Sequence, residues 1–502
     1  MVAAPEPLAP PATPRKRVRI PRPTLGGVVL GAALTVILVV LCRRVGDPDF
    51  WWHMETGKWI VNHAAIPPHE LFAYTVSRPW ADQEWGSEVL GWLIFSGSGF
   101  LAFSLAYTAV TWVGFWFIWR RMALERVPAL IAAGVLVVAA LAGTAVWGPR
   151  SQMISFALTC LTLYWVETFL RDRDRRLYLL PLVTLVWANL HGGFVYCLAV
   201  VGLAAASETA LWVVAPRDPA HRRRSLRLWA VLAGCAIAGL VNPLTFRAYL
   251  AAIQTQTSAI QQSFIAEWHS PNFHSAEELG LELLLLLVVF AMGFRRPRLW
   301  DALLTVVGIY AALSAVRNAP LAAAALAPMV AWAFAGAWER SHWRDRFETW
   351  LRRRRSDLLV LASLGAVVVA AGTVGFAAHT LSGQTASTEA NFPVGAADWL
   401  ASHPSVGTRM FNAYDWGGYL IYRFYPDRPV FIYGEATELG NALLEEVNDV
   451  ETAQPDWQQV LTKYGVDYIV ERTDSSLSMA LSVDPEWQQV YRDSFSVIFV
   501  KR

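Results

Sequence analysis

Residues 47–88 read DPDFWWHMETGKWIVNHAAIPPHELFAYTVSRPWADQEWGSE and gather acids, histidines and tryptophans between two long apolar runs. Asp47 and Pro48 are typical of a helix start, with Asp47 as the N-cap and Pro48 in the first turn, where its missing N–H costs nothing. We expect that helix to run to about His63, before prolines break the chain. Three acids then close the loop and could fold back toward Asp47 and Asp49: Asp82, Glu84 and Glu88.

The composition indicates a polytopic α-helical membrane protein. Of 502 residues, 55% are hydrophobic and only 16% are charged, and 24 are tryptophans, which is far from an average soluble chain. The net charge of +2 forms no single basic patch, so we expect no nucleic-acid partner. The cysteines all lie in or beside apolar segments and form neither a disulfide framework nor a CxxC metal site: Cys42, Cys160, Cys197 and Cys235.

The membrane domain is predicted to occupy residues 25–379, after a basic, disordered tail at residues 1–24. Arg43 and Arg44 follow the first apolar run in place of a small-residue cleavage site, so we expect an uncleaved span. A long external loop, residues 43–99, follows it. Because a span needs about 20 apolar residues, we predict eleven: 25–42, 100–119, 128–147, 152–170, 177–190, 194–215, 228–246, 278–294, 301–316, 319–337 and 357–379.

The distribution of Lys and Arg predicts the orientation. These residues concentrate in the tail and in the loops that alternate with it, such as RRMALER and ERSHWRDRFETWLRRRR. The positive-inside rule places those segments in the cytoplasm. With an odd number of spans, the first long loop and the C-terminal segment both lie outside, as expected for a multi-pass protein of the plasma membrane.

After about residue 380 the hydropathy falls and a mixed pattern begins. The short apolar runs MFN, VFIY, YIVE and SVIFV alternate with helix-like stretches at residues 394–402 and 456–463. This pattern predicts a small extracytoplasmic α/β domain at residues 380–502. The domain lacks a GxGxxG after a strand and a GxxxxGK[ST], so nothing indicates nucleotide binding.

Ionisable residues near the external ends of the spans are the candidate functional residues, because charges are costly at that depth. Each also has a structural interpretation: Asp47 as a helix cap, Arg150 as an interface anchor, His191 as a hydrogen-bonded residue at a helix break. HExxH and GxSxG do not occur, so zinc and serine chemistry are unsupported. The candidates are Asp47, Asp49, His53, Asp82, Glu84, Arg150, Asn189, His191, Glu267, His269 and Arg317.

These features together resemble the GT-C superfamily, the membrane glycosyltransferases that use polyprenyl-phosphate-linked sugars. DPDFWWH is similar to a DP-aromatic stretch after the first span of the oligosaccharyltransferase catalytic subunit, which places the acid of that stretch on Asp47. NAYDWGGYLIY, residues 412–422, is similar to a Trp-Asp-Tyr-Gly segment in the external domain of that subunit. The resemblance therefore adds Asp415 and Trp416 as candidate substrate-binding residues.

The resemblance implies transfer of a sugar from a polyprenyl-phosphate-linked donor to a glycan, lipid or protein acceptor at the outer face of the membrane. Such a donor is already activated, so the enzyme must deprotonate the acceptor and stabilise the departing phosphate. We expect Asp47 to be the base, with Asp49 or Glu84 orienting the acceptor. Arg150 and Arg317 would lie near the phosphate. The tryptophans of the loop could stack on sugars or form an interface belt: Trp51, Trp52, Trp80 and Trp85.

A metal and two other functions stay open. The oligosaccharyltransferase pattern has acids in the second external loop, whereas VWGPRSQ carries Arg150 and no acid. We therefore expect no tightly held cofactor, with divalent Mg or Mn as the alternative. A multi-span transporter or lipid-linked glycan exporter would also hold charges among many spans, but transporters usually show internal repeats and charges near the midplane. The third possibility is a non-catalytic membrane scaffold whose external domain binds partners.

Overall fold

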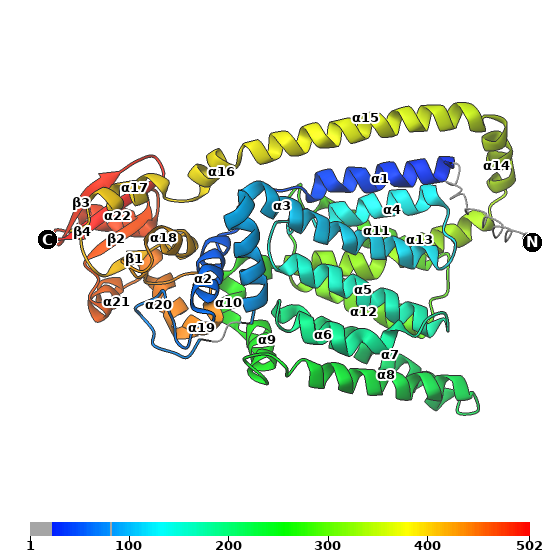
Figure 1. Ribbon diagram of the computed structural model, residues 1–502, viewed down its shortest axis with the longest axis horizontal. Helices are drawn as coiled ribbons and strands as arrows, with labels where there is room; N and C mark the ends of the chain where they lie inside the picture. The colour runs from blue at the N-terminus through cyan, green and yellow to red at the C-terminus, as the bar shows by residue number, and fades with distance from the viewer. Residues whose placement is uncertain (1–22, 81–82) are drawn as a thin grey trace, which may run out of the picture.

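The computed structural model describes residues 23–80 and 83–502, so Asp82 and nearly all of the predicted tail lie outside the described residues. A long helical bundle carries a small mixed domain at one end (Figure 1). Each predicted span overlaps a helix of this bundle: α1 Leu25–Leu41, α3 Trp85–Ala123, α4 Ala129–Ala142, α5 Gln152–Leu170, α6 Leu180–Trp187, α7 Val195–Val214, α8 Pro219–Ala238, α11 Leu279–Met292, α12 Leu299–Ser314, α13 Ala319–Glu339 and α15 Arg355–Ser382.

The lengths of these helices fit a multi-pass membrane protein. Among the described residues, five helices are long and apolar enough to cross a bilayer, and five further apolar helices are shorter. The predicted span at residues 228–246 overlaps α8, which begins with the basic stretch PAHRRRSLR and ends at Ala238. The count of eleven spans therefore stays a prediction. α3 is broken at Gly99, whose φ of 68° favours glycine, and the predicted second span begins at the next residue.

The helix predicted after Asp47 starts two residues later than expected. α2 spans Phe50–His63, with Asp49 at the N-cap position, so the prediction of Asp47 as N-cap and Pro48 in the first turn is wrong. Asp47 instead forms a turn before the helix: its Oδ1 accepts a hydrogen bond from the Asp49 N–H at 3.0 Å, and its carbonyl accepts one from the Phe50 N–H at 3.2 Å. Asp side chains commonly bond a backbone N–H two residues on, which competes with helix formation.

Several short elements connect the bundle at its two ends. α14, Trp343–Arg353, crosses the end of the bundle at which α1 begins (Figure 1). The other connecting elements are η1 Arg176–Leu179, η2 Gly192–Phe194, α9 Arg247–Thr257, α10 Ala259–Phe264, η3 Ala266–Trp268 and η4 Val316–Asn318.

The C-terminal segment forms the predicted α/β domain. Its four strands lie in the order β1-β2-β4-β3, with β1 and β2 parallel and the other pairs antiparallel. The runs MFN, YIVE and SVIFV are strands as expected. The elements are α16 Gln384–Asn391, α17 Val394–Ser402, β1 Met410–Asn412, η5 Tyr414–Trp416, α18 Gly417–Phe424, α19 Ala436–Leu439, α20 Asn441–Glu451, α21 Trp457–Tyr464, β2 Tyr468–Arg472, α22 Ser476–Val483, β3 Trp487–Arg492 and β4 Ser496–Lys501.

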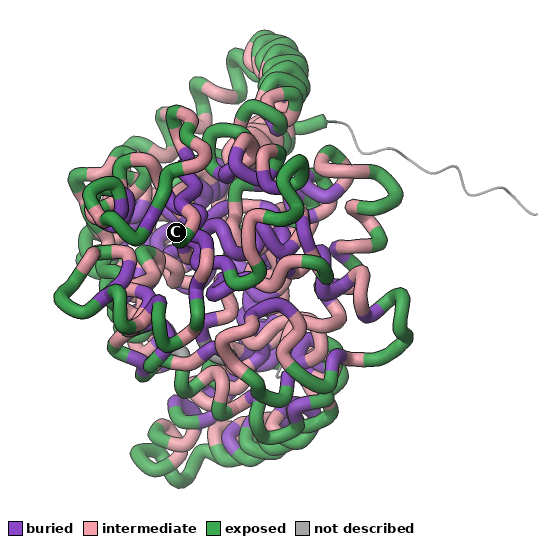
Figure 2. Tube along the Cα trace, turned by 90° about the vertical axis from the view of Figure 1, so that its left-hand side faces the viewer, coloured by how far each residue is buried: buried purple, intermediate pink, exposed green. Residues whose placement is uncertain are grey.

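The run VFIY, residues 430–433, is not one of these strands. Val430 instead donates its N–H to the carbonyl of Phe72, and the Tyr74 N–H donates to the Val430 carbonyl, at 2.9 and 3.2 Å. Tyr433 donates its hydroxyl to Glu70 at 2.9 Å. The apolar run is therefore buried because it joins the domain to the long loop. Seen from the side of the domain, the buried residues of the protein lie at the centre of the view (Figure 2).

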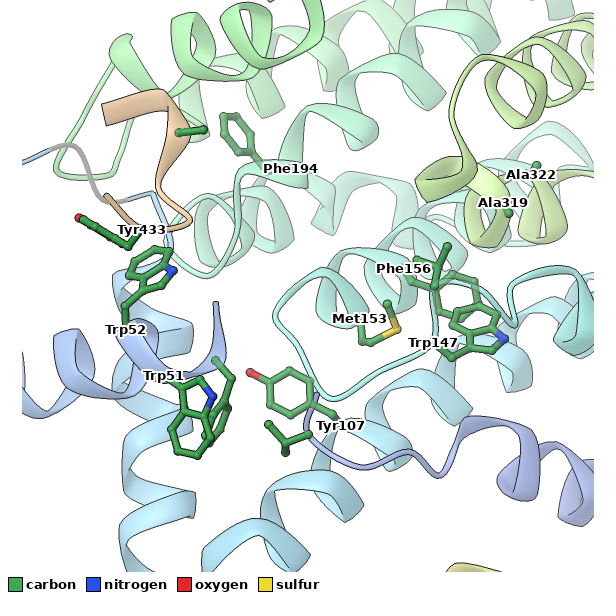
Figure 3. Close-up of a cluster of buried hydrophobic side chains, with 14 of the residues drawn as sticks. Trp51, Trp52, Tyr107, Trp147, Met153, Phe156, Phe194, Ala319, Ala322 and Tyr433 are labelled. Atoms are coloured by element: carbon green, nitrogen blue, oxygen red, sulfur yellow. The ribbon is translucent and has the colours of Figure 1, made fainter. Parts of the chain in front are cut away.

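Tryptophans of the first loop fill the junction between α2 and the domain. Trp51, Trp52 and Trp80 are at most 7% exposed, so both the sugar-stacking and the interface-belt interpretations are wrong for them. The ring of Trp52 lies 5.4 Å from that of Tyr433 (Figure 3). Burying such large rings stabilises the position of α2 against the domain.

Candidate active site

A cavity of about 420 Å³ lies between the bundle and the C-terminal domain. Its walls come from the start of α2, the start of α3, the segment before α5, the η3 and η4 turns and the domain. Candidate residues that are far apart in the sequence meet here: Asp47, Asp49, His53, Glu84, Arg150, His191, Glu267, Arg317 and Asp415.

Arg150 holds two of the acids. Its Nη1 lies 3.5 Å from Asp47 Oδ2 and 2.5 Å from Glu267 Oε1, and its Nη2 donates to the Val146 carbonyl at 3.0 Å. Burial opposes ionisation of Glu267, but the Arg150 charge outweighs it and keeps the pKa of that carboxyl below its ordinary value. Asp47 is therefore fixed by a cation that a second carboxylate orients.

Asp49 lines the cavity and is a carboxyl group whose ionisation changes near neutral pH. Burial and the adjacent Asp47 charge raise its pKa to about 7, although the Trp52 Nε1–H donates to Asp49 Oδ1 at 3.0 Å. The backbone of Gly434 lies directly against this carboxyl: a Cβ there would lie 1.6 Å from Asp49 Oδ1. The position requires glycine because of this close approach of the domain to the start of α2.

Glu84 is the centre of a second polar cluster. The Ser151 hydroxyl donates to Glu84 Oε2 at 2.5 Å, and His191 Nε2 lies 3.5 Å from Glu84 Oε1. Burial opposes ionisation of Glu84, but the His191 and His53 rings, the Ser151 hydroxyl and the Arg317 charge together outweigh it and lower the Glu84 pKa. On the other side of the cluster, His53 Nδ1 lies 2.7 Å from Glu88 Oε1.

The protonation of His191 follows from its neighbours. Burial lowers the pKa of this imidazole, so the ring is neutral at pH 7. The Gly193 N–H donates to His191 Nδ1 at 2.8 Å, so that nitrogen carries no proton. The proton is then on Nε2, the nitrogen that faces Glu84.

Arg317 differs from Arg150 in its partners. Its guanidinium lies over the Trp268 ring, 4.3 Å from the centroid, and lines the cavity. It forms no ion pair with any side chain in residues 23–80 and 83–502. A guanidinium held by an aromatic face keeps its donors available for an anion.

In the part of the chain that the structure describes, no group of three His, Cys, Asp or Glu side chains is placed to hold a metal ion.

No protein-family model and no curated protein matches the sequence. Solved structures do match. ArnT from Cupriavidus metallidurans, bound to undecaprenyl phosphate, is 15% identical, with a TM-score of 0.53 over 94% of this chain and 97% of that one. The Archaeoglobus fulgidus oligosaccharyltransferase, tethered with an acceptor peptide, is 11% identical, with a TM-score of 0.58 over 95% of this chain and 73% of that one. The chain has the GT-C fold.

The resemblance predicted from DPDFWWH is thus confirmed for the GT-C fold, and the architecture of a multi-pass helical protein with a C-terminal sheet domain is confirmed with it. The glycines of NAYDWGGYLIY have a reason in this GT-C fold. Gly417 begins α18 with ordinary helical angles, but a Cβ there would lie 2.0 Å from the Ile432 carbonyl oxygen. A Cβ on Gly418 would lie 2.6 Å from the Pro48 carbonyl oxygen. The two motifs therefore contact each other directly.

Asn189 and His269 are candidates that do not line the cavity, and Trp416 is a third. Its side chain is fully buried in the C-terminal domain, where its ring lies 5.3 Å from that of Phe495. It does not line the cavity, so its role as a substrate-binding residue stays a prediction that this geometry does not support. Asp415, the preceding residue, does line the cavity, and Arg472 donates to it at 3.3 Å.

Several lining residues were not singled out from the sequence. Tyr107 lies within an apolar span, where nothing distinguishes it from a core aromatic. Tyr414 immediately precedes the predicted Asp415, and Glu435 follows the run VFIY, so both lay next to recognised segments. Tyr414 and Glu435 could have been found from the sequence by their position beside a recognised motif.

Proposed function

We propose that this protein is a membrane glycosyltransferase that transfers a sugar from a polyprenyl-phosphate-linked donor to an acceptor at the outer face of the plasma membrane. One observation carries the proposal: the same cavity contains Asp47, a carboxylate fixed by an arginine, and Arg317, a guanidinium with no ion pair in the described part of the chain. The similar ArnT structure is bound to undecaprenyl phosphate, and an oligosaccharyltransferase structure of the same fold is in complex with a dolichol-phosphate.

The reaction needs two groups from the chain. Asp47 accepts the proton of the acceptor hydroxyl while that oxygen bonds to the anomeric carbon. The bond between the anomeric carbon and the phosphate oxygen breaks, and its electrons leave with the lipid phosphate. Arg317 stabilises the charge that develops on that phosphate.

The remaining carboxyl groups position the acceptor. Asp49 is neutral below about pH 7 and can donate a hydrogen bond, whereas Glu84, with its lowered pKa, accepts one. Arg150 keeps Asp47 in place through its contact with Glu267. His53, His191 and Asp415 complete the wall on which a polar substrate rests.

The orientation follows the positive-inside rule. α1 begins at the end of the bundle opposite the C-terminal domain, next to the arginine-rich α14 (Figure 1). With that end in the cytoplasm, the cavity and the domain are extracytoplasmic.

The direct test uses purified protein in lipid and a panel of polyprenyl-phosphate sugars, with release of the polyprenyl phosphate as the measurement. We expect release with at least one donor, and we expect it to survive a strong chelator. Complete loss with the chelator, restored by Mn or Mg, would mean that Asp47, Asp49 and Glu84 or Glu267 hold a metal. No release from any donor would favour the transporter or scaffold alternative.

The pH dependence tests the role of Asp49. Its pKa is raised to about 7, so the carboxyl is protonated below that pH and ionised above it. Because an ionised Asp49 repels the departing phosphate, we expect the transfer rate to fall as pH rises through about 7. Asp49→Asn stays neutral and should lack this fall in a pH–rate profile. An Asp49→Asn variant that is inactive at every pH would instead make Asp49 the base.

A further inference from the structure

A second cavity, of about 630 Å³, adjoins the first. The two share the segment of Asp47 and Pro48 and the segment of Pro149 and Arg150, together with Glu267. Asp49, Glu84 and Arg317 line the first cavity but not the second. Asp47 is therefore at the junction of two spaces, whereas the guanidinium assigned to the leaving phosphate faces one of them.

The second cavity is a groove between the end of α1 and the last turns of α15, and we call it the Arg43 groove. Phe376 and Thr380 of α15 form one wall, and Val146 and Trp147 form another. α15 packs along α1 (Figure 1), and most of its side chains are exposed, with Phe376 at 46%. In a membrane, exposed apolar side chains of this helix face lipid, so the groove adjoins the bilayer.

The segment that leads to Asp47 is rigidly attached to this wall. Arg44 donates from Nε to the Thr380 carbonyl. The Gln384 side chain accepts from the Val45 N–H at 2.9 Å and donates to the Val45 carbonyl at 2.8 Å. These hydrogen bonds hold the wall of the groove at a fixed position relative to Asp47, the proposed base.

Arg43 lines the groove, and the described residues offer its guanidinium no polar partner. Its Nε is buried with no hydrogen bond, and its guanidinium forms no ion pair within the described ranges. Three acids line the groove in the described part of the chain. Asp47 and Glu267 are already bound by Arg150, and Glu277 is exposed. Since an unpaired cation at the membrane boundary is costly, the site fits an anionic group.

We propose that the Arg43 groove binds the acceptor, an amphiphile whose anionic head group contacts Arg43 and whose apolar chain lies against α15. The inference rests on the proposed function, because it takes Asp47 as the base. A base must touch the acceptor, and Asp47 lines the groove. The donor phosphate is assigned to the first cavity by Arg317. The acceptor therefore enters from the groove, and its reacting hydroxyl reaches past Asp47 to Asp49 and Glu84 in the first cavity.

The experiment places photoreactive p-benzoylphenylalanine at position 376 of the full chain in phosphatidylcholine vesicles and measures crosslinking to labelled phosphatidic acid. Labelled diacylglycerol is the neutral comparison. We expect preferential labelling by phosphatidic acid, reduced about tenfold by Arg43→Gln, since a hydrogen bond to a charged group is lost. Arg43→Lys should retain most labelling. Arg247→Gln, an exposed arginine on α9, is the matched control and should change nothing.

Farnesyl phosphate serves as the competitor that mimics the donor lipid. If farnesyl phosphate displaces labelled phosphatidic acid from position 376 more strongly than unlabelled phosphatidic acid does at the same concentration, the groove prefers the donor lipid and the inference is wrong. Equal labelling by diacylglycerol, or labelling indifferent to Arg43→Gln, also overturns it. If no donor releases polyprenyl phosphate while labelling still depends on Arg43, the proposed function and the acceptor role are both wrong. The groove is then a binding site for an anionic lipid without a role in sugar transfer. If release succeeds and labelling ignores Arg43, the groove inference alone falls.

Discussion

Asp47→Asn lowers the rate of sugar transfer by about 10² to 10⁴-fold, the usual contribution of a general base. The amide cannot accept a proton at neutral pH. It does keep an oxygen for the hydrogen bond from the Asp49 N–H, so the turn before α2 should stay intact. Release of polyprenyl phosphate measures the rate, and thermal unfolding in detergent checks that the variant is folded.

Two matched variants separate loss of the base from loss of local structure. Glu267→Gln removes the other carboxylate on Arg150 and should cost far less than Asp47→Asn, because Glu267 acts only through the arginine. Asp47→Ala removes both base and turn acceptor, and we expect it to lose about 1 kcal/mol of stability in addition to activity. If Asp47→Asn and Asp49→Asn both transfer sugar at the wild-type rate, the base lies elsewhere.

The sequence predicts the bundle because the bilayer imposes a local rule. A span must satisfy its backbone within itself, so apolar length alone locates the helices. The same rule predicts that polar residues at the external ends of the spans lie at the same depth relative to the membrane. Asp47, Glu84 and Arg150 could therefore be grouped from the sequence. It cannot predict that Arg150 joins Asp47 to Glu267, because that contact depends on how the helices pack around one another.

Predictions from local patterns were wrong where tertiary contacts competed. Asp47 and Asp49 both precede an apolar helix, and the side chain of Asp47 formed a turn that moved the helix start to Phe50. The sequence around Trp51 and Trp52 does not distinguish rings that face lipid, sugar or the protein core. In the structure both rings are buried because they pack against the C-terminal domain. VFIY has the composition of a strand, yet its hydrogen bonds go to the long loop and to the side chain of Asn412 in place of a neighbouring strand.

β3 is a strand that the sequence pattern does not predict. WQQVYR has two consecutive glutamines and no apolar alternation, so its residues did not suggest a strand. It pairs with β4 at the edge of the sheet, where one face and one edge are exposed to solvent. Edge strands tolerate polar residues, so the apolar pattern that marks a central strand is absent.

Arg317→Gln should lower kcat by about 10² to 10³-fold, the typical effect of removing one preorganised donor to a developing charge. The effect should fall on kcat more than on KM, because the phosphate gains charge as its bond to the sugar breaks. Arg317→Lys should recover part of the rate, since the ammonium keeps the charge but loses the planar contact with Trp268.

The comparison with Arg150 decides whether Arg317 is the phosphate ligand. Arg150 already contacts two carboxylates, so Arg150→Gln should release Asp47 and Glu267 and disturb both activity and folding. Arg317 forms no ion pair among the described residues, although its charge lowers the pKa of Glu84 and of Glu267, so Arg317→Gln should lower the unfolding temperature less than Arg150→Gln does. An Arg317→Gln variant with wild-type kcat would show that the leaving phosphate is stabilised by another group, with Arg150 the next candidate.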